Sequence, residues 1–144
     1  MRARRPADRG SAALFVAIFA PAMLFLAGLV IDGGAALEAK QRAADIAEQA
    51  ARAAAGQCDV ALLRSAGDCR LTSRAAALAA AGPFMDSTVT DWSLVQTRPV
   101  GPGQYHGVEV SVTIKFQTTL LGIDPDFRTL TIKETAEAVA VTGL

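Results

Sequence analysis

Residues 11–31 read SAALFVAIFAPAMLFLAGLVI, a run of twenty-one residues without a charged side chain. Arg9 precedes this run and Asp32 follows it. As an α-helix it would be about 31 Å long, which matches the hydrocarbon thickness of a bilayer. A core helix of a soluble domain is rarely apolar on all sides over such a length. The sequence therefore predicts a membrane-spanning helix over residues 11–31.

Charge is unevenly distributed around this helix, although the whole chain has a formal net charge of zero. Residues 1–10 contain four arginines and one aspartate, a balance of +3, which leaves −3 for the remaining residues. Basic residues that flank a span stay on the cytoplasmic side. We expect a basic cytoplasmic leader at 1–10 and an extracytoplasmic domain at 32–144. That domain has no basic patch, so nucleic acid is not an expected partner.

The helical pattern continues beyond the apolar run as a stalk over residues 32–55. Small side chains recur at three- and four-residue intervals, at Ala36, Ala39, Ala43, Ile46, Ala47, Ala50 and Ala54. Charged side chains occupy the other faces. Such a narrow and shallow stripe is suited to close packing against a sheet or another helix. Within the membrane segment, Pro21 predicts a helix kink.

Two cysteines, Cys58 and Cys69, fall in a connecting region at 56–86, and the segment between them is predicted to be a loop. Ten residues separate them, and no other cysteine or nearby histidine completes a metal site. In an oxidising compartment such a pair favours a disulfide. Two unpaired thiols and a redox-active pair are the alternatives.

Beyond the cysteines the sequence predicts a short helix and then a sheet. The helix is expected over 74–81, with Thr72 or Ser73 as its N-cap. From residue 87 the apolar period changes to two, which is typical of strands. We expect strands over 89–99, 108–117 and 128–141, with an apolar loop over 120–127. The fold class is therefore α+β, with a three-stranded antiparallel sheet at 87–144.

Residues 8–55, DRGSAALFVAIFAPAMLFLAGLVIDGGAALEAKQRAADIAEQAARAAA, resemble the N-terminal segment of TadE/TadG-like proteins of the tight-adherence (Flp) pilus system. The layout of leader, apolar helix, polar helix and sheet is also similar to that of pilin-like proteins. The resemblance is strong over about 45 residues, and the remainder fits in layout only. The positions that match the family pattern are Asp32, Gly33, Gln41, Ala44, Asp45 and Ala47.

This resemblance implies a minor pilin-like or pilus-assembly component that contacts other Tad pilus or envelope proteins by helix packing. In the TadE branch a prepilin peptidase cleaves after the leader glycine, which corresponds here to the bond between Gly10 and Ser11. Pilin-type substrates have glutamate at the fifth mature position, where this chain has Phe15. Without this glutamate, the chain is more similar to the TadG branch of the family, in which a retained anchor is expected. Cleavage and retention both remain open.

No constellation of catalytic residues accompanies these features. His106 is the only histidine and is interpreted as a surface or turn residue, and Asp32 as a solvated residue just outside the headgroups. We expect no enzymatic activity, metal, cofactor or small-molecule substrate. An anchored binding module unrelated to pili, using the loop at 120–127 and the one-sided sheet, is the alternative function. A third possible function is that of a domain that is cleaved from its anchor and secreted.

Overall fold

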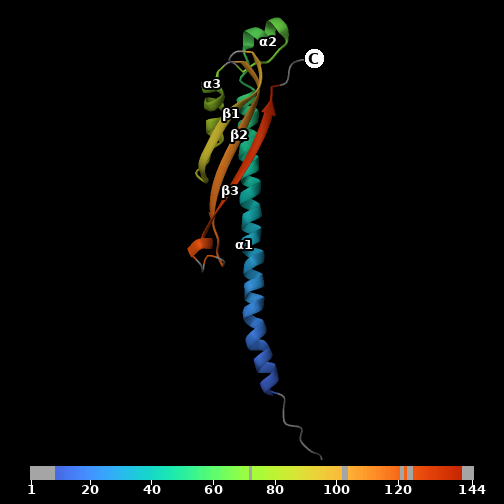
Figure 1. Ribbon diagram of the computed structural model, residues 1–144, viewed down its shortest axis with the longest axis vertical. Coiled ribbons are helices and arrows are strands. Elements are labelled where there is room, and N and C mark those ends of the chain that lie inside the picture. The colour runs from blue at the N-terminus through green and yellow to red at the C-terminus, as the bar shows by residue number, and fades with distance from the viewer. Residues whose placement is uncertain (1–8, 72, 102–103, 121, 123–124, 141–144) are drawn as a thin grey trace, which may run out of the picture.

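A computed structural model describes residues 9–71, 73–101, 104–120, 122 and 125–140 (Figure 1). The sheet has the order β1-β2-β3, with both neighbouring pairs antiparallel. This arrangement confirms the predicted α+β plan. The elements in chain order are α1 (Arg9–Ala55), α2 (Val60–Ala66), α3 (Arg74–Ala81), the 3-10 helix η1 (Gly82–Phe84), β1 (Val89–Gly101), β2 (Gln104–Gln117), the 3-10 helix η3 (Pro125–Phe127) and β3 (Thr129–Val139).

Helix α1 is 47 residues long and dominates the shape of the molecule. At 1.5 Å per residue it extends over about 70 Å. Its C-terminal half lies along the sheet, and its N-terminal half projects beyond the sheet (Figure 1). The predicted continuity of the apolar helix with the stalk is thus confirmed. Pro21 lies inside α1, and the kink expected there stays a prediction.

The core lies between the alanine stripe of α1 and one face of the sheet. All the predicted stripe residues are buried except Ala36, which is half-buried. From the central strand β2, four alternate side chains face this stripe and are buried, as the period of two predicted: Val108, Val110, Val112 and Ile114. Because alanine side chains are small, the helix approaches the sheet closely and the valines of β2 are removed from water. The burial of each valine then contributes about 1.5–3 kcal/mol to the free energy of folding.

The opposite face of the sheet is polar, and side-chain pairs link its strands. Ser111 and Thr135 are directly opposite in the register of β2 and β3, and their hydroxyl oxygens are 2.9 Å apart. Glu137 on β3 accepts a hydrogen bond from Arg98 Nε at 2.8 Å and from Thr97 Oγ1 at 3.0 Å. These contacts join both edge strands across β2.

The Glu137 contacts predict a pH-dependent contribution to stability. Hydrogen bonds from Arg98 first, and then from Thr97, hold the pKa of Glu137 below its ordinary value of 4.5. Because the folded pKa is the lower one, this contribution is present above the unfolded pKa and is lost as pH falls through the folded pKa. Glu137→Gln should therefore lower the thermal unfolding midpoint slightly at neutral pH and have no effect in acid. A difference that stays constant with pH would contradict this assignment.

The segment between the cysteines differs from the prediction, because it contains the short helix α2. Asp59 caps α2 by accepting hydrogen bonds from the amides of Ala61 and Leu62, and Gly67 ends it with a φ of 66°. No residue of α2 is buried, so no apolar period marks it in the sequence. Helix α3 has the predicted bounds, with Ser73 as its N-cap.

The boundaries of the strands differ modestly from the expected ranges. Strand β1 continues to Gly101, β2 begins at Gln104, and β3 starts at Thr129. The C-terminal limit expected for the last strand, residue 141, lies outside the described residues. Pairing extends β1 and β2 through positions where the alternation of apolar side chains is absent.

Cys58 and Cys69 form the expected disulfide, with their Cα atoms 5.0 Å apart. The amide of Asp59 donates to the carbonyl of Arg70 at 3.0 Å and closes the same loop. Directly after it, Leu71 is fully buried and exchanges backbone hydrogen bonds with Tyr105 of β2. The disulfide thus lies where the connecting region joins the sheet.

Candidate functional site at the junction of helix and sheet

Asp32 is the polar centre of the junction between α1 and the sheet. Its side chain is buried, with 3% of the residue exposed. One carboxylate oxygen accepts the amide of Thr119 at 2.7 Å, and the other accepts the amide of Leu120 at 3.0 Å. Both donors lie in the loop after β2, more than 80 residues further along the chain. The interpretation of Asp32 as a solvated residue was therefore wrong.

The geometry of the loop explains why it needs an acceptor from outside. The amide of Thr118 donates to the carbonyl of Arg128 at 3.1 Å, which is the last link between the two ends of the loop. The next two amides, of Thr119 and Leu120, both donate to Asp32 of α1. A carboxylate satisfies both donors at once, and hydrogen bonds to a charged acceptor are stronger than neutral ones.

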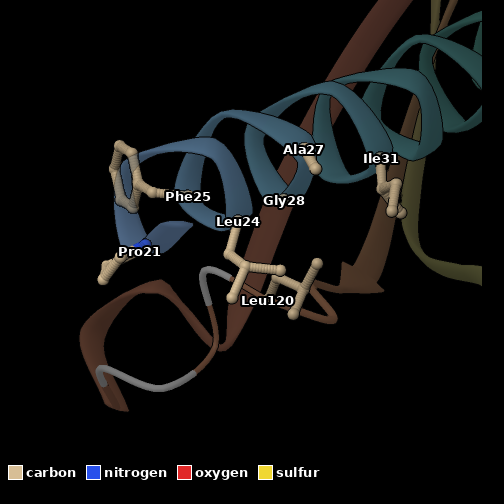
Figure 2. Close-up of a pocket in the computed structure, with 7 residues that line it drawn as sticks. All are labelled: Pro21, Leu24, Phe25, Ala27, Gly28, Ile31 and Leu120. Carbon is tan, nitrogen blue, oxygen red and sulfur yellow. The ribbon is translucent and has the colours of Figure 1, made fainter. Parts of the chain in front are cut away.

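Gly28 lies one helical turn before Asp32, on the same face of α1. Leu120 packs against it, so that a Cβ atom at position 28 would come within 2.9 Å of the Leu120 Cβ. Gly28 is also the only position between residues 11 and 31 that is buried. Only glycine allows the loop to approach this closely. Gly28 and Asp32 together therefore fix the loop after β2 to the apolar helix. Figure 2 shows Leu120 of this loop beside the helical turn that contains Gly28.

Gly28→Ala should weaken this attachment. The added Cβ pushes Leu120 outward and lengthens the hydrogen bonds to Asp32, which we expect to cost about 1 kcal/mol. Amide hydrogen exchange at Thr119 and Leu120 should become faster in the variant. Gly33→Ala is the matched control, because a Cβ there meets nothing within 4 Å. The control should be neutral or slightly stabilising, since alanine favours helix; equal exchange in both variants would contradict the contact.

The remaining family-pattern positions divide into a buried group and an exposed group. Ala47 is fully buried against the sheet, and Ala44 is half-buried. Gly33, Gln41 and Asp45 are exposed. No hydrogen bond or ion pair joins Gln41 or Asp45 to another residue in the described part of the chain. Packing within this chain thus accounts for Asp32 and Ala47, and leaves Gln41 and Asp45 facing outward.

The expected processing site lies at the other end of α1. Helix α1 begins at Arg9, so the bond between Gly10 and Ser11 is in its first turn. Phe15, at the position where pilin-type substrates carry glutamate, stacks on Phe19 with ring centroids 4.2 Å apart. This end of the helix therefore presents aromatic surface in place of an acidic side chain.

His106, which the sequence analysis interprets as a surface or turn residue, lies inside strand β2. Its side chain is one-quarter exposed, and its Nε2 is 3.3 Å from Asp68 Oδ1 in a geometry that makes no hydrogen bond. The other oxygen of Asp68 accepts Arg70 Nε at 2.6 Å. Within the described ranges, no group of three or more His, Cys, Asp or Glu side chains could hold a metal ion. This cluster supplies neither a nucleophile nor a metal-ligand set.

Comparisons with known proteins add one finding to this geometry. A family model described as putative Flp pilus-assembly TadE/G-like matches residues 10–57, about a third of the chain. No curated protein and no solved structure matches the chain. Among the described residues, one helix is long and apolar enough to cross a membrane by length and composition. The resemblance noted in the sequence is thereby confirmed: residues 10–57, which contain α1 from Gly10 onward, match the TadE/G-like Flp pilus-assembly family model.

Proposed function

We propose that this protein is a membrane-anchored structural component in the assembly of a Flp (Tad) pilus. The observation that carries the proposal is the two-part helix α1 within the matched segment. Its first part, residues 11–31, exposes large apolar side chains on almost every side, whereas its second part packs on the sheet. A helix surface of that kind requires a bilayer or the apolar helices of other subunits.

In this proposal residues 11–31 cross the membrane once, with the leader at 1–10 in the cytoplasm and residues 32–144 outside it. The positive balance of the leader supports this orientation. The disulfide between Cys58 and Cys69 is in keeping with an oxidising compartment for the domain. Outside the membrane the protein acts through contacts with pilus or envelope proteins, and not by catalysis.

The outward-facing motif residues Gln41 and Asp45 supply the surface for such a contact. Both lie on the part of α1 that follows the apolar run, both are exposed, and neither has a hydrogen bond or ion pair within the described part of the chain. Glu38 and Arg42, which also face outward, are joined by an ion pair of 3.0 Å. The exposed face of α1 therefore carries two polar side chains that are joined by an ion pair, Glu38 and Arg42. It also carries two that have no such bond within the described part of the chain, Gln41 and Asp45.

Replacing both unpaired residues, Gln41→Ala with Asp45→Ala, should reduce pilus assembly severalfold in the native cell while the protein level and thermal unfolding remain those of wild type. Deletion of the gene gives the lower limit of pilus number. The double variant Glu38→Ala with Arg42→Ala is the matched control. Pilus number and surface adherence are the measurements. Normal piliation in the deletion strain would overturn the proposed function, and normal piliation only in the double variant would overturn the role of this surface.

The alternative of a binding module unrelated to pili relied on the apolar loop at 120–127 and on the one-sided sheet. Leu120, the first residue of that loop, packs against Gly28 of the same chain, and its backbone is bonded to Asp32. These contacts give the loop a role within the molecule. No observation on the described residues favours the alternative over the pilus component.

A further inference from the structure

An apolar groove runs between α1 and the loop after β2, alongside the segment proposed above to span the membrane. It has a volume of about 600 Å³. Figure 2 shows the side chain of Leu24, from α1, extending toward that of Leu120, from the loop. Among the residues that the structure describes, all those that line the groove are apolar: Pro21, Leu24, Phe25, Ala27, Gly28, Ile31 and Leu120. Water has no hydrogen-bonding partner among these side chains.

The burial of Asp32 changes where the membrane boundary falls on α1. Because its carboxylate is enclosed by the loop, the first exposed charged side chain after the apolar run is Glu38. The uncharged outer surface therefore extends from residue 11 to residue 37, which is about 40 Å of helix. This exceeds the hydrocarbon thickness of about 30 Å. Gly28 lies well within that surface, so hydrocarbon reaches the level at which Leu120 contacts α1.

The backbone of the loop after β2 is also suited to an apolar environment. Backbone donors that enter hydrocarbon must be satisfied within the protein, and Asp32 accepts the amides of both Thr119 and Leu120. Asp126 and Arg128, farther along the same loop, are exposed and charged. Such side chains belong at the level of the headgroups. The described part of the loop thus combines an apolar side chain at Leu120 with charged side chains at Asp126 and Arg128.

We propose that an acyl chain of a bilayer phospholipid occupies this groove, which places Leu120 and the tip of the sheet in the extracytoplasmic leaflet. The domain then has a second contact with the membrane besides its anchor. This contact would keep the sheet packed along α1. This inference rests on the membrane-spanning role proposed for residues 11–31, but on no contact with a pilus partner.

Quenching of tryptophan fluorescence by brominated phospholipid tests the proposal, because Trp92 is the only tryptophan of the chain. Full-length protein is reconstituted in phosphatidylcholine vesicles whose acyl chains carry bromine near the glycerol end. Trp92→Phe with Leu120→Trp places the probe at the groove, and Trp92→Phe with Phe19→Trp places it on the anchor. Wild-type protein, with Trp92 on the sheet, is the aqueous control. Circular dichroism confirms that all three proteins have the same fold.

We expect the Leu120→Trp probe to lose a fraction of its emission similar to that lost by the Phe19→Trp probe, and Trp92 to lose almost none. Quenching at Phe19→Trp without quenching at Leu120→Trp would overturn the groove and leave the anchor intact. Absence of quenching at both positions would overturn the membrane-spanning role itself. Quenching at Leu120→Trp that disappears as the protein-to-lipid ratio rises, while Phe19→Trp is unchanged, would mean that a second copy fills the groove, which also overturns the proposal.

Discussion

Asp32→Ala should lower the free energy of unfolding by about 3 kcal/mol, because it removes the acceptor for two backbone amides at once. The amides of Thr119 and Leu120 then lose their acceptor at the junction of α1 and the sheet. Chemical unfolding in detergent, followed by the fluorescence of Trp92, measures the loss. Amide exchange at the two donors should accelerate before any other part of the sheet opens.

Two further substitutions make the result specific to the carboxylate. Asp32→Asn retains one acceptor oxygen and should cost about half as much as the alanine variant. Asp45→Ala removes an exposed aspartate of the same helix and should change stability by no more than about 0.5 kcal/mol. If Asp32→Ala were no less stable than Asp45→Ala, the attachment of the loop to α1 would be wrong.

Ala47→Leu should be the next most damaging change, with an expected loss of about 2–3 kcal/mol. Ala47 is fully buried in the core cluster that α1 forms with the sheet. Three added carbon atoms have no space there, so the helix must move away from the valines of β2 or adopt strained rotamers. Trp92, which packs against this core, reports the change in chemical unfolding.

Ala35→Leu is the matched control for this substitution. Ala35 belongs to the same helix, but it is exposed. The larger side chain should alter stability by no more than about 0.5 kcal/mol. Equal losses for the two variants would show that leucine is tolerated poorly anywhere on this helix, and would contradict the close packing of the alanine stripe on the sheet.

Periodicity explains which parts of the fold could be predicted from the sequence. The alanine stripe from Ala39 to Ala54 and the alternation from Val108 to Phe116 each mark one buried face, so the helix and the central strand were correctly predicted. Helix α3 was bounded correctly because Ser73 and Gly82 flank it. Helix α2 buries no residue, so its only signals were Asp59 and Gly67, both of which were assigned to a loop.

The candidate site was less accessible to sequence reasoning, because its contacts join residues that are far apart in the chain. A lone aspartate after an apolar run resembles a solvated boundary residue until the loop that covers it is placed. Gly28 likewise has no local reason to be glycine, and only the approach of Leu120 explains it. By contrast, the disulfide was predictable, since the two cysteines had no competing partners.

Thiol labelling from outside the membrane tests the anchored arrangement most directly. Ser93→Cys introduces a free thiol on an exposed position of β1, and the native cysteines are protected by their disulfide. Spheroplasts of the native cell are treated with a membrane-impermeant maleimide, and the chain is recovered with the membranes. We predict that it is labelled fully before lysis. A chain that is labelled only after lysis, or that does not sediment with the membranes, would contradict a single-pass anchor with residues 32–144 outside the cytoplasm.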